Sequence, residues 1–202
     1  MTLWRGKFPL ILASQSRARQ TLLANAGIHF EAMAAEIDER DVQQNSGLSA
    51  PGKIAALLAR EKALSVSARS PGKFVVGADQ ILALGTRLFS KPADRAQATE
   101  QLRALAGRAH ELHSAVAVAR DGKILFEAVD VARMTMRRLG EAEIDVYLDE
   151  AGAAVTTSVG AYQLEGLGVH LFERIEGDHF TILGLPLLPL LAFLRGERLL
   201  AV

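Results

Sequence analysis

Two serines and two arginines follow the first apolar run of this 202-residue chain. Residues 10–13 are apolar, and Ser14, Ser16, Arg17 and Arg19 come directly after them. A strand that leads through hydroxyl residues into a helix start brings free backbone N–H groups to the positive end of the helix. Arginine adds a planar guanidinium that matches phosphate oxygens. The stretch predicts an anion-binding site, and the alternative is an ordinary Ser16 cap with solvated arginines.

A carboxylate further along the chain could supply reactive chemistry. Asp79 follows the apolar residues 74–76 and Gly77, so we expect it at the carboxyl end of a short strand, where α/β proteins place reactive groups. A carboxylate there could orient a water, accept its proton or hold a divalent metal. The alternative is an aspartate with only a turn-forming role.

Two lysines could neutralise an anionic ligand. Lys91 precedes Pro92, which fixes the local backbone, so its ammonium could meet a phosphate. Lys62 falls on a stretch with helical spacing, residues 54–64. Taken alone, each lysine also fits a solvated surface position.

Carboxylates gather again in two predicted loops. Glu39 belongs to an acidic cluster at 36–41, which is either solvated or shares a Mg²⁺ site with Asp79, since Mg²⁺ usually takes one or two carboxylates plus substrate phosphates. Glu165 precedes Gly166 in a glycine-punctuated loop at 161–168. Glycine permits close approach to a ligand, so this side chain could read a base edge or belong to a plain turn.

The elements that must position these residues mix strands and helices. Asp121-Gly122 predicts a hairpin. The expected strands cover 10–13, 29–33, 74–76, 81–84, 88–89, 110–118, 124–126, 129–136 and 169–175. The expected helices cover 17–26, 54–64, 94–106, 141–148 and 184–195, with 36–51 and 161–168 as loops. This pattern predicts an α/β or α+β fold with a mixed sheet.

Composition excludes several classes of function. Half of the residues are hydrophobic, which suffices for a sizeable core, and we expect a single domain over residues 1–202. The chain has no cysteine, so it has no disulfide, thiolate metal site or thiol nucleophile. Basic and acidic residues balance at 23 each, which disfavours a nucleic-acid partner. The apolar runs are too short for a membrane span, so we expect a cytoplasmic protein without membrane association.

The ordered set of motifs resembles the Maf family of nucleoside triphosphate pyrophosphatases. The resemblance spans about 10–194, nearly the whole chain, and order and spacing make it specific. The matching pieces are Leu12-Ala13-Ser14-Gln15-Ser16 with Arg19 and Leu22-Leu23, Ile37-Asp38-Glu39, Glu61-Lys62-Ala63, Gly77-Ala78-Asp79, Lys91-Pro92, Leu105-Ala106-Gly107-Arg108 with His110, Gly160-Ala161-Tyr162 through Gly166, and Gly184-Leu185-Pro186.

This resemblance implies an α/β fold of the Maf and inosine triphosphatase kind, with a curved mixed sheet, flanking helices and a central nucleotide-binding cleft. It implies hydrolysis between the α- and β-phosphates to a nucleoside monophosphate and pyrophosphate, which cleanses the nucleotide pool. Asp79 would accept the proton of the attacking water or share the metal, and Glu39 would help to hold metal or water. The phosphate contacts would come from Ser14, Arg19, Lys62 and Lys91.

Three positions depart from many family members and bear on substrate choice. Ala18 stands where many have the first of two arginines, Gln80 where many have threonine, and Glu165 where many have glutamine. The three departures disfavour the branch that acts on dTTP and UTP. Gln80, Glu165 and the run Leu171-Phe172-Glu173-Arg174 followed by Glu176-Gly177 resemble the branch that acts on 7-methyl-GTP. A carboxylate accepts hydrogen bonds, so Glu165 could take those of a guanine N1–H and N2 amine.

The resemblance also implies a divalent metal, Mg²⁺ or else Mn²⁺ or Co²⁺, and a homodimer. A second functional class stays open: a nucleotide-binding regulator of cell division or septum formation with little turnover. The presence of Asp79, Lys62 and Lys91 favours the enzyme, because binding alone does not require a placed carboxylate beside a triphosphate.

Overall fold

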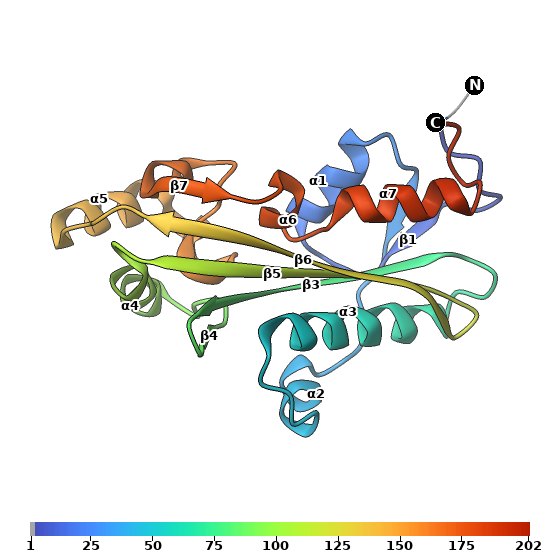
Figure 1. Cartoon of the computed structure of the whole chain (residues 1–202), viewed down its shortest axis with the longest axis horizontal. Helices are drawn as coiled ribbons and strands as arrows, with labels where there is room; N and C mark the ends of the chain where they lie inside the picture. The colour runs from blue at the N-terminus through green and yellow to red at the C-terminus, as the bar shows by residue number, and fades with distance from the viewer. Residues whose placement is uncertain (1–2) are drawn as a thin grey trace. The chain divides into compact units, whose positions relative to one another are not determined.

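A computed structural model describes residues 3–202 and contains one mixed sheet of seven strands with helices beside it (Figure 1). The strand order is β2-β1-β3-β5-β6-β7, and β4 pairs with β3. β1 pairs in parallel with β2 and β3, whereas the β3–β4 and β6–β7 pairs are antiparallel. The predicted α/β class with a mixed sheet is therefore confirmed.

The elements in chain order are β1 (Leu10–Leu12), α1 (Arg17–Asn25), β2 (Phe30–Ala32), α2 (Glu39–Asn45), α3 (Pro51–Ser67), β3 (Val75–Leu84), β4 (Arg87–Phe89), α4 (Arg95–Leu105), β5 (Ala109–Arg120), β6 (Lys123–Met136), α5 (Glu141–Ala151), η1 (Gly152–Thr156), η2 (Val159–Ala161), η3 (Leu167–Leu171), β7 (Phe172–Glu176), α6 (His179–Ile182) and α7 (Leu187–Gly196). None of the helices within residues 3–202 combines the length and apolar character that crossing a membrane requires.

The chain divides into two compact units. The first unit comprises residues 1–80, 114–130 and 179–202, and the second comprises 81–113 and 131–178. Three of the four boundaries fall inside β3, β5 and β6, and the fourth lies directly before α6. The single domain over 1–202 stays a prediction, and its first two residues lie outside the described part of the chain.

The core of the first unit follows from the apolar run at β1. Leu10 and Leu12 belong to one buried cluster with residues of α1 and α7, while Ile11 belongs to another with Val66 of α3. Side chains alternate between the faces of a strand, so a continuous apolar run can bury both faces. Figure 1 shows α3 and α7 on opposite sides of the strands, as this alternation requires.

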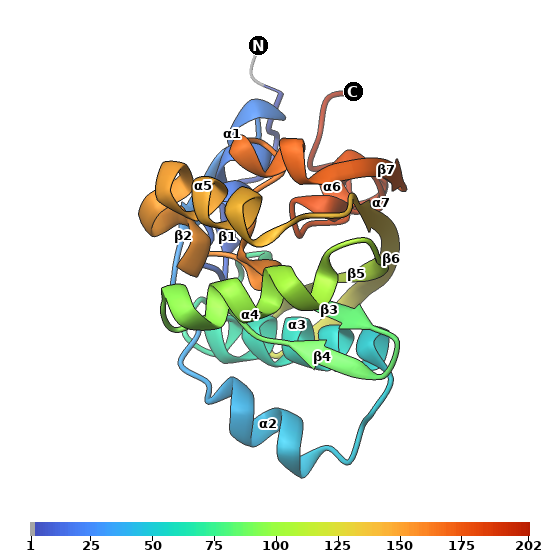
Figure 2. The same ribbon diagram turned by 90° about the vertical axis from the view of Figure 1, so that its left-hand side faces the viewer.

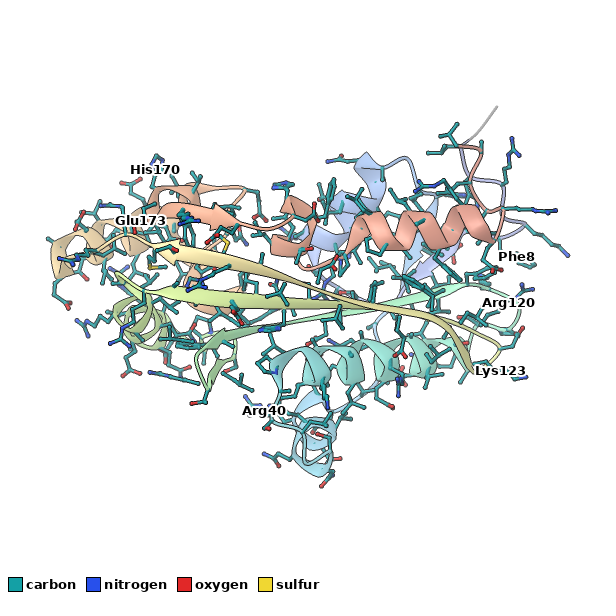
Figure 3. All side chains as sticks on the ribbon, viewed as in Figure 1. Phe8, Arg40, Arg120, Lys123, His170 and Glu173 are labelled. Atoms are coloured by element: carbon teal, nitrogen blue, oxygen red, sulfur yellow. The ribbon has the colours of Figure 1, made fainter. Side chains whose placement is uncertain are left out.

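The hairpin between β5 and β6 is confirmed at the expected dipeptide. Asp121 and Gly122 have φ angles of 50° and 73°, which a two-residue hairpin turn requires at both positions. Arg120 and Lys123 flank the turn (Figure 3). The Asp121 carboxylate accepts a hydrogen bond from the Gly72 backbone N–H at 2.7 Å, which fixes the turn to a neighbouring loop.

The prediction of a loop over 36–51 was wrong for Glu39–Asn45, which form the helix α2. Asp38 caps this helix by accepting hydrogen bonds from the backbone of Arg40 and Asp41. Acidic residues in the first turn favour the positive helix end, so the acidic cluster starts a helix rather than a plain loop. Figure 2 shows this short helix beside α3.

Three strand predictions also needed correction. Residues 74–76 and 81–84 lie on one uninterrupted strand, β3, so Asp79 is in mid-strand and not at a strand end. The expected strands 124–126 and 129–136 likewise form one strand, β6. Residues 169–171 are in the 3₁₀ turn η3, before β7 begins at Phe172. Hydrogen bonds to neighbouring strands keep β3 and β6 continuous through polar and small residues, at which the sequence pattern predicted breaks.

Candidate active site

Lys62 lies between two carboxylates in the first unit. Its Nζ is 2.6 Å from Asp79 Oδ1 and 2.8 Å from Glu39 Oε1. Lys62 and Asp79 are buried, whereas the side chain of Glu39 is 52% exposed. The structure therefore brings together three predicted site residues from α2, α3 and β3, with the carboxylate of Glu39 facing solvent.

The meeting of Lys62 and Asp79 depends on a close approach of α3 to β3. α3 presents the fully buried alanines Ala59 and Ala63. A Cβ atom on Gly77 would lie 2.1 Å from the Ala59 carbonyl oxygen and 2.6 Å from the Ala63 nitrogen, distances that no real side chain occupies. The backbones of the helix and the strand therefore touch at Gly77, beside Ala63, which directly follows Lys62. The position needs glycine for lack of space and not for a special backbone angle.

Arg19 is the second buried cation of this unit. Its Nε donates to the Gly184 carbonyl at 2.7 Å, and its Nη1 donates to the Ala78 carbonyl at 2.8 Å and to Ser14 Oγ at 3.2 Å. Ser16 caps α1 by accepting from the Arg19 backbone N–H. Nη2 is not used in these contacts, which leaves two N–H donors of a fixed guanidinium for a ligand. Ser14 and Arg19 of the predicted anion site are therefore in contact, while Arg17 is exposed.

Burial governs the protonation of this cluster. Removal from water raises the pKa of Asp79, and the nearby charges of Lys62 and then Arg19 oppose that rise. The charge of Glu39 adds to it. Burial also lowers the pKa of Arg19, while the charges of Asp79 and Glu39 act in the other direction. A carboxylate with a raised pKa is a stronger proton acceptor than an ordinary surface aspartate.

Gln80 and Ala18 were predicted to influence substrate choice. Ala18 is half-buried on α1 beside Arg19. Gln80 points away from Asp79 along β3, and its Nε2 lies 2.9 Å from Ser114 Oγ and 3.0 Å from the carbonyls of both Thr181 and Ile182. The sequence reasoning gave no role to Ser114 or to these carbonyls. The Gly184-Leu185-Pro186 motif was the one signal for this turn.

Lys91 and Glu165 belong to the second unit, and both are exposed. A buried glutamine on α4 holds the backbone near both. Gln101 Nε2 donates to the Ser90 carbonyl at 2.8 Å, and Gln101 Oε1 accepts from the Gly160 N–H at 3.0 Å. The segment before Lys91 and the segment before Glu165 are therefore linked by one side chain, which sequence reasoning did not single out.

Asp79 and Glu39 are the residues that could hold a divalent cation. Each uses one oxygen in its contact with Lys62, so each has a second oxygen to offer, and oxygen donors suit Mg²⁺. Within residues 3–202 no group of three or more histidine and acidic side chains is placed to hold a metal ion. Two carboxylates fit a metal that takes its remaining ligands from substrate phosphates and water.

Comparison with known proteins identifies the family of this chain. Residues 9–197 match the family described as Maf-like protein. The chain belongs to the Maf-like family. A protein of Bradyrhizobium diazoefficiens named nucleoside triphosphate pyrophosphatase is 73% identical over 202 residues, which is the full length of both chains. A protein of Brucella abortus named 7-methyl-GTP pyrophosphatase is 50% identical over 192 residues, covering 94% of this chain and 96% of that protein.

The predicted resemblance of this Maf-like chain is thereby confirmed. A solved HAM1 protein of Coxiella burnetii is 15% identical with a TM-score of 0.42, over 65% of this chain and 74% of that one.

Proposed function

We propose that this Maf-like chain is a nucleoside triphosphate pyrophosphatase that releases a nucleoside monophosphate and pyrophosphate. The observation that carries the proposal is a buried carboxylate, Asp79, bonded to the ammonium of Lys62 in a unit that also fixes the guanidinium of Arg19. Full-length relatives at 73% and 70% identity bear the name of this activity. Positioning and electrostatic stabilisation supply most of the catalysis in phosphoryl chemistry, so such a site suits the reaction.

In the reaction, a water oxygen bonds to one of the two phosphorus atoms that share the oxygen between the α- and β-phosphates. The bond from that phosphorus to the bridging oxygen then breaks. Asp79 takes the proton of the water, for which its raised pKa suits it. Arg19 Nη2 and Lys62 meet the phosphate oxygens and the negative charge that develops on the leaving group. Ser14 keeps the guanidinium in place through its contact with Nη1. A phosphate contact from Lys91 stays a prediction of the family resemblance.

We propose that Asp79 and Glu39 also hold a divalent cation, with Mg²⁺ as the first candidate and Mn²⁺ and Co²⁺ as alternatives. When bound, the cation would neutralise part of the charge of about four on the triphosphate. Lys62 then acts as the link between the two carboxylates and keeps both oxygens oriented. A homodimer stays a prediction alongside this metal.

The substrate we propose is a modified purine nucleotide of the 7-methyl-GTP kind. Support comes from the 50% identical Brucella relative and from Ala18, Gln80 and Glu165, the three departures seen in the sequence. The carboxylate of Glu165 is exposed and therefore available to accept hydrogen bonds from a guanine edge.

The proposal is tested by pyrophosphate release from a panel containing dTTP, UTP, GTP and 7-methyl-GTP, with Mg²⁺, Mn²⁺ or Co²⁺. Wild type should prefer 7-methyl-GTP, and Asp79→Asn should lose at least about 100-fold in kcat, as expected for loss of a general base. Asp41→Asn, an exposed aspartate on α2, is the matched control and should match wild type. Nucleotide binding without turnover by wild type would favour the regulator, and equal turnover of all four nucleotides would refute the base preference.

A further inference from the structure

Two neighbouring residues at the end of η2 have left-handed backbone angles. Gly160 and Ala161 have φ angles of 78° and 60°, and both residues are buried. Glycine adopts such angles freely, whereas the Cβ atom of alanine makes them unfavourable. A residue with this strain persists only where the surrounding structure fixes its backbone. The backbone of Ala161 therefore needs support from neighbouring elements.

The hydroxyl of Tyr147 on α5 supplies this support. Tyr147 is buried, and its hydroxyl donates to the Ala161 carbonyl at 3.1 Å. Burial raises the pKa of Tyr147 to about 12, so the phenol remains a donor at neutral pH. Gln101 of α4 accepts the hydrogen bond of the Gly160 N–H at 3.0 Å, so the strained pair is held from two helices. Removing the Tyr147 hydroxyl would release the carbonyl of the strained residue and leave the other bond in place.

The residue that follows the strained pair is anchored by its side chain. The hydroxyl of Tyr162 is 2.8 Å from His110 Nε2, and its ring meets that of Phe172 edge-on, with 4.8 Å between the ring centroids. Because the ring is fixed, the orientation of the peptide group between Ala161 and Tyr162 sets the direction in which the backbone leaves this anchor. The bond from Tyr147 to the Ala161 carbonyl controls that orientation.

Glu165 lies in a turn that starts directly after this anchor. The Gln163 carbonyl accepts a hydrogen bond from the Gly166 N–H at 3.2 Å, so residues 163–166 form a β-turn with Glu165 as its third residue. A Cβ atom on Gly168 would lie 2.4 Å from the Gln163 carbonyl oxygen, so the chain packs back against the start of the turn. The turn therefore moves as one piece, and a change of direction at the anchor displaces the carboxylate of Glu165.

We propose that Tyr147 is a positioning residue for Glu165 and thereby supports the choice of base. Its hydroxyl fixes the peptide group of Ala161, and the turn at 163–166 transmits that constraint to the carboxylate. This inference rests on the proposed function and deepens it, because Glu165 is the side chain proposed to accept hydrogen bonds from the guanine edge. Tyr147 acts through Glu165 and not on the reacting phosphates.

The first test replaces Tyr147 by phenylalanine, which keeps the ring and removes only the hydroxyl. Tyr147→Phe should lower kcat/KM for 7-methyl-GTP and GTP by about threefold to tenfold, the range expected for the loss of one hydrogen bond. The change should lie in KM, because binding of the base is lost equally in the ground state and the transition state. For dTTP and UTP, kcat/KM should stay within about twofold of wild type, so the preference for the guanine nucleotides narrows.

A double-mutant cycle shows whether the effect passes through Glu165. In a Glu165→Gln background, Tyr147→Phe should change the ratio of kcat/KM between 7-methyl-GTP and UTP by less than about twofold, because the carboxylate that it positions is already gone. A tyrosine with a merely structural role would have the same effect in both backgrounds.

A measurement on the substrate-free protein tests the turn directly. In Tyr147→Phe the Gly166 N–H should exchange with deuterium about threefold to tenfold faster than in wild type, since the turn that protects it is less firmly held. Thr99→Val is the matched control, because Thr99 also donates its hydroxyl to a backbone carbonyl, that of Arg95 at 2.9 Å, but this bond is exposed and lies within α4. Thr99→Val should match wild type in exchange and in base preference.

Gly168→Ala disturbs the same turn from its other end. The added methyl would meet the Gln163 carbonyl oxygen. The variant should therefore narrow the base preference as Tyr147→Phe does, with the Tyr147 hydroxyl in place. It keeps the inference testable if Tyr147→Phe does not fold, which circular dichroism and thermal melting establish for each variant.

Several results would overturn the inference. A folded Tyr147→Phe variant with wild-type base preference, or with wild-type exchange at Gly166, would remove the positioning role. An equal loss for all four nucleotides would make Tyr147 a support of the common reaction, and the same loss in the Glu165→Gln background would show that it acts independently of Glu165. A wild-type preference in Gly168→Ala would exclude the turn as the route. If wild type releases no pyrophosphate, the proposed function fails, whereas exchange of the Gly166 N–H still decides whether Tyr147 holds the turn.

Discussion

The two units treat their polar residues in opposite ways. In the first unit, the predicted site residues Arg19, Lys62 and Asp79 are buried, and each of them is bonded to fixed partners. In the second unit, Lys91 and Glu165 are exposed, and the buried polar groups are Gln101 and His110, which were not predicted as site residues.

The difference separates two tasks. Fixed charges cost no reorganisation when negative charge develops, so the first unit suits the bond-breaking chemistry. Exposed side chains keep their freedom and their hydration, so under the proposed function Glu165 suits recognition of a base that varies. In the second unit, the buried side chains of Gln101 and His110 hold the segments that precede Lys91 and Glu165. Four experiments test this difference between the two units.

The largest effect is expected at Arg19. Arg19→Lys keeps the charge but cannot donate at once to the Gly184 carbonyl, the Ala78 carbonyl and Ser14 Oγ. We expect kcat/KM for pyrophosphate release to fall by about 100- to 1000-fold, as for loss of one preorganised donor to a developing charge. Arg17→Lys, on the same helix and exposed, is the control. A loss of less than about threefold would mean that fixed geometry does not matter here.

The second experiment concerns acid stability and His110 of the second unit. Burial lowers the pKa of His110 from 6.5 to about 4, and its Nε2 is 2.8 Å from the Tyr162 hydroxyl. Above pH 6.5 the imidazole is neutral in both states. As the pH falls from 6.5 towards 4, the unfolded chain takes up a proton that the folded chain refuses, so stability is lost.

Over that window the loss from His110 alone should reach about 3 kcal/mol. Urea unfolding of wild type and His110→Phe at pH 7, 6, 5 and 4 measures it as the part of the pH dependence that the variant lacks. His29→Phe, on an exposed histidine, should keep the wild-type pH dependence. Equal pH dependence in wild type and His110→Phe would show that the histidine is not held neutral.

The third experiment removes the glutamine that links two segments of the second unit. Gln101→Leu leaves the buried Gly160 N–H without its acceptor and the Ser90 carbonyl without its donor. The free energy of unfolding should drop by about 1–3 kcal/mol, the cost of a buried polar group left unpaired. Chemical denaturation measures it, with exposed Glu100→Gln as the control. If stability is unchanged, water has replaced the bonds and the segments are not held by Gln101.

The smallest effect is a shift in a pH profile. The charge of Glu39 is the least of the influences that raise the pKa of Asp79. Glu39→Gln should therefore lower that pKa, and the acidic limb of kcat/KM should move to lower pH. Profiles from pH 4 to pH 9 measure this, with Glu36→Gln as the control. Movement to higher pH would mean that Glu39 does not act on Asp79 through its charge.

The sequence predicted the elements that have strong local signals. The strand at residues 10–13, the Ser16 cap and the Asp121-Gly122 hairpin all occur where expected, because each depends on residues close together in the chain. The mid-strand position of Asp79 was missed, since sheet pairing with distant strands extends β3 past a Gly-Ala-Asp-Gln sequence that locally favours a turn.

The sequence named several side chains that the structure brings into contact, and it missed the groups that support them. Ser14, Arg19, Lys62, Asp79 and Glu39 were named from their types and from the family resemblance. Two of the three acceptors that fix Arg19 are backbone carbonyls, which every residue has, so no residue type signals them. Gln101 makes both its bonds to backbone as well, and it reads in the sequence as an ordinary polar position on a helix.

Gly77 carries a consequence for how this chain can vary. It has no functional group, yet a single added methyl would strike the backbone of α3 and push Lys62 away from Asp79. A saturation library screened for activity should therefore show one of its most intolerant positions at a residue without a side chain. The distance between the backbones of α3 and β3 decides whether Lys62 reaches Asp79. A genetic screen would detect this requirement as a position where no substitution is tolerated.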